Sequence, residues 1–213
     1  MTDTTDIGFL LYPGVTQLDV TGPAQILSRV PGAVIHMVWK TTDPVATDAG
    51  FAILPTDDFA TCPDLDVLCV PGGPGQRPLM TDAEVLDFLK RQGSQARYIT
   101  SVCGGSLLLG AAGLLAGYRS ACHWAFRDIL PRFGAIPVAD RVVTDRNRIS
   151  GGGVTAGIDF GLTLAAELAS EDIAREIQLF VEYNPAPPFN AGTPAGAGAE
   201  ITARVRAQLE EGL

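Results

Sequence analysis

Residues 97–109 read RYITSVCGGSLLL, and this stretch holds the change from strand to helix around which the rest of the sequence can be arranged. The apolar run from Tyr98 to Val102 predicts a short buried β-strand, and residues 106–112 predict the beginning of an apolar helix. Cys103 stands at the junction and is followed by two glycines. Glycine tolerates positive φ and lets other groups approach the backbone, so this pair predicts a sharp strand-to-helix turn.

The position of Cys103 allows two interpretations. A sulfur atom at the beginning of a helix lies near unpaired N–H groups and the positive end of the helix dipole, which predicts a lowered thiol pKa and a nucleophilic thiolate. The same arrangement with serine is the nucleophile elbow of hydrolases. The alternative is a small buried hydrophobic residue, as most free cysteines are. Gly104 and Gly105 do not form a core-packing pattern, which supports the nucleophile, and on position alone both interpretations of Cys103 stay open.

The composition predicts one globular domain over residues 1–213. Hydrophobic residues make up 46% of the chain and charged residues 18%, so no disorder is expected. The formal net charge is −9 and no cluster of lysine and arginine is present, which argues against nucleic-acid binding. The first apolar run, residues 7–12, is too short for a signal sequence or a membrane span. We therefore expect a cytoplasmic protein that binds neither nucleic acid nor membrane.

The cysteines and histidines do not form a metal or disulfide pattern. The cysteines have no C-x-x-C spacing, and a cytoplasmic location keeps them reduced. The sequence has only two histidines and no P-loop or dinucleotide-binding motif, so no metal or cofactor is predicted. His36 lies within a strand pattern and is expected to be structural, whereas His123 either caps a helix or lies in the core. The cysteines are Cys62, Cys69, Cys103 and Cys122.

Apolar runs alternate with helical patterns along the chain, which predicts an α/β domain with a mostly parallel sheet and helices on both faces. The expected strands lie at residues 7–12, 34–39, 66–71, 98–102 and 119–122, with a short strand at 51–54 and a hairpin over 142–150. The expected helices span residues 24–30, with Thr21 as the cap, 82–91, 106–112, 124–133, 154–168 and 171–183. An irregular Pro/Gly-rich segment, 184–199, and a terminal helix, 201–213, follow.

Parallel sheets of this kind bind ligands beyond the carboxyl ends of their strands. That rule places Asp19, the Gly72-Gly73 turn, Cys103 and the glycines at 151–153 at one edge of the sheet. Asp19 either caps a helix or is a partly desolvated carboxyl group whose raised pKa lets it carry a proton. The backbone N–H groups of the Gly72-Gly73 turn are suited to an oxyanion site next to Cys103.

Five strings in this order resemble the ThiJ/PfpI superfamily, and among its branches they are most similar to the isocyanide hydratases. The resemblance covers residues 7–194. Two of the strings, around the cysteine and around GGGVTAGIDF, are also shared with the amidotransferase-like domains of AraC-type transcription regulators, which carry a further helix-turn-helix domain for which no room is expected here. The strings are IGFLLYPGVTQLDVTGP, VLCVPGGPG, YITSVCGGSLLLGAAGLLAGYRSACHW, ISGGGVTAGIDFGLTLAAEL and VEYNPAPPFNAGTP.

The resemblance implies a flavodoxin-like three-layer sandwich that forms a homodimer. It also implies roles for particular residues: Cys103 as the nucleophile, Asp19 as its acidic partner, and Gly72 and Gly73 as donors of backbone N–H groups. Gly152 lies in the segment that packs beside the cysteine-bearing helix in this branch. Isocyanide hydratases carry threonine directly after the cysteine, where this chain has Gly104. Proteases and glyoxalase-like branches carry histidine there, so their chemistry is not expected.

The activity implied by the resemblance is cofactor-free hydration of a small-molecule isocyanide to an N-substituted formamide, which makes the protein a carbon–nitrogen lyase. The reaction passes through a thioimidate on the cysteine and needs a nucleophile, one carboxyl group and water. Two alternatives stay open. One is a redox or stress-response protein of the same superfamily in which Cys103 is oxidised. The other is a non-catalytic ligand-sensing module related to the AraC-type regulators.

Overall fold

The computed structural model describes residues 4–211 and contains a seven-stranded sheet with the strand order β10-β11-β7-β6-β1-β2-β5. Every neighbouring pair is parallel except β10 and β11, which form the predicted hairpin. The predicted mostly parallel sheet is therefore confirmed. The strands are β1 (Thr5–Leu10), β2 (Ala33–Trp39), β5 (Asp57–Asp58), β6 (Val67–Val70), β7 (Tyr98–Val102), β10 (Val142–Asp145) and β11 (Arg148–Gly151).

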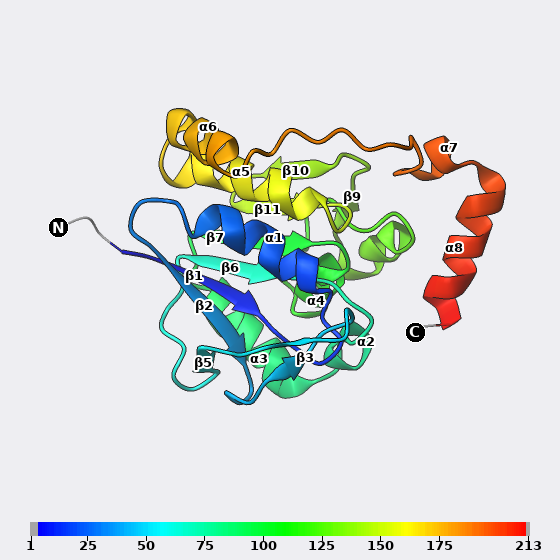
Figure 1. The fold of residues 1–213 in the computed structure, drawn as a ribbon. Coiled ribbons are helices and arrows are strands. Elements are labelled where there is room, and N and C mark those ends of the chain that lie inside the picture. The colour runs from blue at the N-terminus through cyan, green and yellow to red at the C-terminus, as the bar shows by residue number, and fades with distance from the viewer. Residues whose placement is uncertain (1–3, 212–213) are drawn as a thin grey trace.

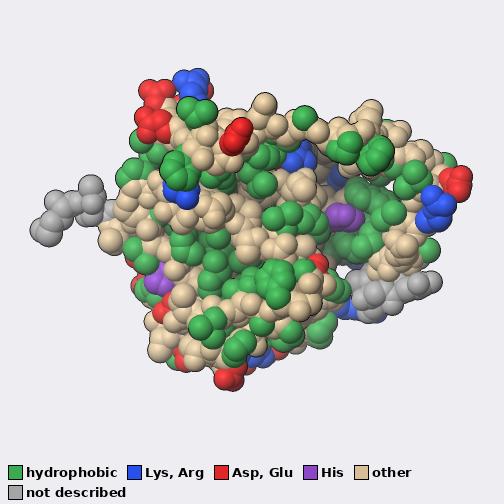
Figure 2. All heavy atoms as spheres, viewed as in Figure 1, with side chains coloured by type: hydrophobic (Ala, Val, Ile, Leu, Met, Phe, Trp, Pro, Cys, Tyr) green, Lys and Arg blue, Asp and Glu red, His purple; other side chains and the backbone are tan. Residues whose placement is uncertain are grey.

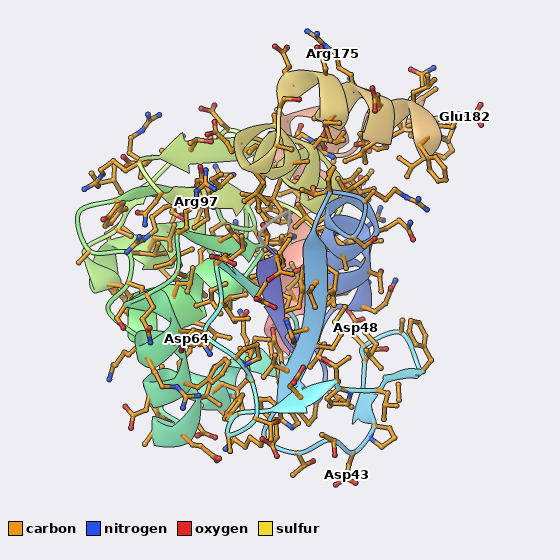
Figure 3. The ribbon with its side chains drawn as sticks, turned by 90° about the vertical axis from the view of Figure 1, so that its left-hand side faces the viewer. Asp43, Asp48, Asp64, Arg97, Arg175 and Glu182 are labelled. Carbon is orange, nitrogen blue, oxygen red and sulfur yellow. The ribbon has the colours of Figure 1, made fainter. Side chains whose placement is uncertain are left out.

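Helices cover both faces of the sheet, as the predicted fold class requires (Figures 1 and 3). On one face α1 packs against α5, and α6 packs on α5; on the other, α3 contacts α4. Figure 3 labels Arg175 on α6, the outermost helix of its layer, and Glu182 just after the end of that helix. The main helices are α1 (Gln17–Leu27), α3 (Ala83–Gly93), α4 (Gly105–Ala111), α5 (Ala156–Leu168) and α6 (Glu171–Phe180).

The central strands are apolar on both faces because both faces are covered. All four residues of β6 and the last four residues of β1 and β7 are buried. Continuous apolar runs of this kind are typical of parallel strands between two helical layers. The order β2-β1-β6-β7-β11 is the flavodoxin-like order, in which the ligand site lies beyond the carboxyl ends of the strands. These ends lead into Asp19, Gly72 and Cys103.

Helix α1 differs from the prediction of a helix over residues 24–30 capped by Thr21. It begins at Gln17, so Asp19 lies in its first turn and Thr21 lies inside the helix. The Asp48 carboxylate, on the loop between β3 (Val45–Ala46) and β4 (Ala52–Ile53), accepts hydrogen bonds from the Thr16 hydroxyl at 2.7 Å and the Gln17 N–H at 3.2 Å (Figure 3). The N-cap residue is Thr16, a common capping type, but its side chain makes no cap hydrogen bond and donates to Asp48 instead, so a residue distant in sequence satisfies the helix N-terminus.

The remaining elements are short. The region predicted as a helix over 124–133 is a 3₁₀-helix, η1 (Arg127–Phe133), which contains Pro131. Proline lacks the N–H that a regular α-helix requires, which explains the tighter form. The other short elements are α2 (Gln76–Leu79), β8 (Arg119–Ser120), β9 (Ile136–Pro137) and α7 (Pro194–Ala197).

The C-terminal region leaves the sheet and returns beside the carboxyl ends of the strands (Figure 1). The segment predicted as irregular over 184–199 is irregular apart from α7, and the terminal helix α8 spans Ala199–Glu211. The last two residues of the predicted terminal helix, 212–213, lie outside the described residues. Within residues 4–211, no helix has the length and apolar character needed to cross a membrane.

His36 links three strands at the edge of the sheet opposite the hairpin. On β2, its Nε2 lies 2.8 Å from Asp6 Oδ1 on β1, and its Nδ1 lies 2.9 Å from Asp57 Oδ2 on β5. The side chain is only 13% exposed. Burial alone would lower the pKa of His36, but the hydrogen bonds to Asp57 and Asp6 outweigh it and raise the pKa above its ordinary value of 6.5. These contacts give His36 a structural role.

The free energy of unfolding is expected to fall as the pH rises through the raised pKa of His36. Because the pKa of His36 is higher in the folded protein than in the unfolded chain, protonation of His36 stabilises the fold. This stabilisation is full when the pH is below 6.5, the pKa in the unfolded chain, and it is lost as the pH rises and the folded imidazolium deprotonates. His36→Gln should cost about 1–3 kcal/mol at pH 6 and remove this pH dependence. Urea unfolding of both proteins at pH 6 and pH 9 measures the effect. An equal loss of stability with pH in the variant would contradict it.

Candidate active site

Cys103 occupies a strained junction between β7 and α4. Its φ is +58°, in the left-handed region that a non-glycine residue rarely adopts. The Cys103 N–H donates to the Gly151 carbonyl at 3.0 Å, which holds the turn against β11. The sequence predicts positive φ at Gly104 and Gly105, but the positive φ belongs to Cys103, and Gly104 has a φ of −74°. Gly104 and Gly105 are required instead for space: a Cβ on Gly104 would overlap the Gln76 carboxamide, and one on Gly105 the Val70 carbonyl.

Asp19 meets Cys103 from the first turn of α1. Its side chain is 1% exposed, and Oδ2 accepts a hydrogen bond from the Gly72 N–H at 2.8 Å. The carboxyl group also shares a hydrogen bond with the Cys103 thiol, while Oδ1 has no hydrogen-bond partner within residues 4–211. Burial, with a smaller contribution from the Asp48 charge, raises the pKa of Asp19 to about 7 against the opposing effect of the Gly72 N–H. Asp19 can therefore gain or lose a proton at neutral pH.

The predicted low pKa of the Cys103 thiol is wrong. Burial raises this pKa well above its ordinary value of 9.0, and the nearby Asp19 carboxylate and Cys122 raise it further. Cys103 is only 8% exposed. The Gly104 N–H does reach the sulfur and favours the thiolate, as expected at a helix start, but desolvation is the larger effect. The site therefore holds a thiol beside a carboxyl group, and a thiol in such surroundings becomes nucleophilic only when a neighbouring base takes its proton.

Gly72 lies where the side chains of Cys103 and Asp19 meet. A Cβ at this position would lie 2.5 Å from the Gly104 nitrogen, 3.0 Å from the Cys103 Cβ and 3.1 Å from Asp19 Oδ2. Gly73 has φ +147°, and its own Cβ would meet the backbone of residues 14–16. The preceding Pro71 carbonyl accepts a hydrogen bond from the buried Tyr12 hydroxyl at 2.9 Å. The turn after β6 is thus held against the loop that follows β1.

Gly152 follows β11 at the same edge of the sheet. The atoms nearest to its absent Cβ are the carbonyl oxygens of Asp140, Arg141 and Cys122, at 3.6–3.7 Å. Its N–H donates to Arg141 at 2.9 Å. Gly152 therefore lies beside the segment around Cys122, and its nearest atoms do not belong to α4, the helix that follows the cysteine.

Serine hydroxyls behind Cys103 hold the segment around Cys122 in place. Ser106 on α4 donates to the Ala121 carbonyl at 2.6 Å and lies 2.9 Å from the Ser101 hydroxyl. The Ala121 N–H donates to the Ser150 hydroxyl at 2.8 Å. This buried network connects β7, α4 and β11 to the chain that leads into His123.

A cavity of about 360 Å³ opens above Cys103. Figure 2 shows it as a hollow between the body of the molecule and α8, with hydrophobic side chains on its walls. The part of the chain from residue 4 to 211 places no group of three or more His, Cys, Asp or Glu side chains where they could hold a metal ion. The cavity is lined by Thr16, Asp48, Gly73, Pro74, Gln76, Cys103, Gly104, His123, Phe126, Val154, Gln208 and Leu209.

Sequence reasoning missed the polar residues of this cavity, among them Asp48, Gln76 and His123. Asp48 lies in a segment with no motif, whereas Gln76 directly follows the VLCVPGGPG string, whose end was the one signal for it. His123 had been assigned to a cap or the core; it lines the cavity, and burial together with the Arg127 charge lowers its pKa below 6.5. A neutral imidazole at neutral pH is the result. Two signals pointed to it: His123 is one of two histidines in the chain, and it lies near the end of the string that begins at Tyr98 and contains Cys103.

The fold and the site together define a class of protein. A flavodoxin-like sheet carries a cysteine at a strand-to-helix turn, a carboxyl group from the first helix and a glycine turn from the next parallel strand. The chain matches the DJ-1/PfpI family over residues 5–167 and belongs to that family. The resemblance to the ThiJ/PfpI superfamily is therefore confirmed.

Particular relatives narrow the comparison. The chain is 54% identical over 207 residues to the isonitrile hydratase of Pseudomonas putida, covering 97% of this chain and 91% of that protein. It is 51% identical to a ThiJ/PfpI family protein from Pseudomonas syringae, whose crystal structure superposes with a TM-score of 0.95 over 98% of this chain and 87% of the other. The transcriptional regulator GbdR of Pseudomonas aeruginosa is 30% identical over 227 residues, and this chain spans 60% of its length.

Proposed function

We propose that this protein hydrates isocyanides to N-substituted formamides and is therefore a carbon–nitrogen lyase. The observation that carries the proposal is the pairing of the buried Cys103 thiol with Asp19, whose pKa of about 7 suits proton transfer in both directions. The relationship to the isonitrile hydratase of Pseudomonas putida supports the same reaction, since isonitrile and isocyanide are two names for one functional group. The largely apolar cavity suits an isocyanide carrying an organic substituent.

In the first step the Cys103 sulfur attacks the terminal carbon of the isocyanide. Asp19, as the carboxylate, accepts the thiol proton while the carbon–sulfur bond forms and then delivers it to the same carbon. The product is a thioimidate, R–N=CH–S–Cys103, and the Asp19 carboxylate is restored. The raised pKa of the thiol makes this base necessary, because few molecules hold a free thiolate at neutral pH. Cys103 thus acts as the nucleophile of an elbow of the kind known from hydrolases.

In the second step water adds to the thioimidate carbon. As the carbon–oxygen bond forms, Asp19 accepts one proton from the water and passes it to the thioimidate nitrogen, which restores the Asp19 carboxylate. The resulting R–NH–CH(OH)–S–Cys103 collapses to the formamide R–NH–CHO, and the hydroxyl proton returns to the Cys103 sulfur. No electrons leave or enter the site, and the sum of both steps is isocyanide plus water giving formamide.

The glycines support these two steps. The Gly72 N–H fixes the Asp19 carboxyl group, and the Gly104 N–H stabilises negative charge on sulfur. Gly73 lines the cavity and completes the turn that brings Gly72 to the site. Gly152 lies beside the Cys122 carbonyl and is not among the residues that line the cavity. We assign no metal or cofactor to the reaction, because the thiol, the carboxyl group and water account for every bond that forms and breaks.

We further infer a homodimer that acts in the cytoplasm. All four cysteines are free, which fits a reducing compartment. Large apolar side chains are exposed, among them Leu179 at 81% and Phe189 at 79%, and surfaces of this kind often pack against a second copy. Light scattering after size exclusion should give twice the mass of one chain. A single-chain mass at micromolar concentration would contradict the dimer.

Turnover of an aryl isocyanide tests the proposed reaction directly. The purified protein is expected to convert the isocyanide to the matching formamide, identified by its ultraviolet absorbance and mass, and Cys103→Ser provides the blank. Formamide production no faster than in this blank would overturn the proposal. Binding of the isocyanide without turnover would instead favour the ligand-sensing alternative.

A further inference from the structure

Gln76 is a buried polar residue for which the proposed reaction has so far given no role. It is the first residue of α2 and lines the cavity above Cys103. Gln76 is only 4% exposed, and its side-chain oxygen, Oε1, has no hydrogen-bond partner among the residues described. A buried acceptor without a partner is costly, and in native proteins it usually marks a site filled by water or ligand.

The absence of a side chain at Gly104 lets the Gln76 carboxamide occupy its position. The three atoms nearest to a Cβ built on Gly104 are Oε1, Nε2 and Cδ of Gln76, all at distances that no real Cβ tolerates. The carboxamide therefore lies directly against the Gly104 backbone, next to the reactive cysteine. Any larger residue at position 104 would have to displace it.

The chemistry of the two reactants decides what Oε1 can bind. An isocyanide has no N–H or O–H group at its reacting end, so it cannot donate a hydrogen bond to Oε1. Water, the second reactant, has two such groups. The unpartnered oxygen at the wall of the cavity is therefore suited to water and not to the isocyanide carbon.

We infer that the Gln76 carboxamide, placed against Gly104, binds and positions the water that attacks the thioimidate on Cys103. The inference rests on the proposed function and assigns a residue to its second step. The Gln76 Oε1 accepts a hydrogen bond from one O–H of the water, and Asp19 removes the proton of the other O–H. The water oxygen then forms the bond to the thioimidate carbon. Gln76 takes no part in the first step, in which no water reacts.

Single-turnover measurements separate the two steps. Excess protein is mixed with an aryl isocyanide, quenched with acid at successive times and analysed by intact mass spectrometry for the covalent adduct. Gln76→Met, similar in length but without a strong acceptor, should form the adduct within twofold of the wild-type rate and hydrolyse it about tenfold more slowly. Gln25→Met changes an exposed glutamine on α1 and should leave both rates unchanged.

The outcomes are distinct. Adduct hydrolysis within twofold of wild type in Gln76→Met would overturn the inference, as would an equal slowing of both steps, which a merely structural role would produce. If the wild-type protein forms neither adduct nor formamide, the proposed function itself fails. Slow adduct hydrolysis with normal adduct formation in Gln76→Met supports both the proposed function and the role of Gln76.

A second pair of variants tests the shared space. Gly104→Thr should displace the carboxamide and slow adduct hydrolysis, and Gln76→Ala should slow it by removing the acceptor. In the double variant the Gly104→Thr hydroxyl enters the space that Gln76→Ala vacates, so hydrolysis should be at least fivefold faster than in the slower single variant. If the rate of adduct hydrolysis in the double variant instead falls by the product of the two single-variant losses, the two side chains do not share one space, which would overturn the inference.

Discussion

Replacing Asp19 with asparagine is expected to lower kcat/KM for isocyanide hydration by about 10²–10⁴-fold, the usual contribution of a positioned acid or base. Asparagine keeps an oxygen that can accept the Gly72 N–H, so the fold around the site should survive. It cannot accept the proton of the Cys103 thiol, whose raised pKa makes that transfer necessary. Initial rates at several isocyanide concentrations measure the loss, and circular dichroism verifies the fold.

The same variant should change the pH dependence. The pKa of Asp19 is about 7, and the active form of the pair carries one proton, as thiol and carboxylate. Below pH 7 the carboxyl group becomes protonated, so kcat/KM of the wild type should fall about tenfold per pH unit. Above pH 7 it should reach a plateau. Asp19→Asn should show no such step, and a wild-type profile that is flat between pH 5 and pH 8 would remove Asp19 from the role of base.

Gly72→Ala is expected to lower kcat/KM by about 10²-fold. The added methyl group would lie 2.5 Å from the Gly104 nitrogen and 3.1 Å from Asp19 Oδ2, so the loops that bring the thiol and the carboxyl group together must separate. A displacement of about 1 Å between reacting groups can have an effect of this size. Overpacking of a buried turn should also cost about 1–3 kcal/mol of unfolding free energy.

Gly153→Ala is the matched control for Gly72→Ala. No atom lies within 4 Å of a Cβ at Gly153, so this substitution adds a methyl group near the site without a clash. Its activity and its urea midpoint should remain close to those of the wild type. If both variants lose activity equally, the effect does not arise from crowding between Asp19 and Cys103.

The meeting of Cys103 and Asp19 could be predicted from sequence because the positions of both residues follow from strand ends. Cys103 stands directly after a buried apolar run, and Asp19 follows the first such run across a short loop. In a parallel sheet these ends meet at one edge, which brings the two residues together without knowledge of any side-chain contact. The alternation of strands and helices likewise predicts the sheet and its covering layers.

The remaining features depend on contacts between distant segments. The beginning of α1 is set by Asp48, and the space at Gly104 is filled by Gln76 from the turn after another strand. The direction of the Cys103 pKa shift was predicted wrongly because a helix N-terminus is visible in the sequence, whereas the depth of burial around the sulfur is not. The sequence around a residue shows the local effects on its pKa, such as a helix N-terminus. Desolvation depends on how distant segments pack around the residue, which the local sequence does not show.

The contribution of α8 to the cavity wall has a practical consequence for anyone who purifies the protein. Gln208 and Leu209 lie close to the end of the described chain and line the same cavity as Cys103, whereas β1 begins on the opposite side of the molecule (Figure 1). An affinity tag fused after α8 would emerge beside the entrance and compete with substrate for it. A tag before β1 leaves that entrance open, so kinetic constants should be measured with amino-terminally tagged or untagged protein.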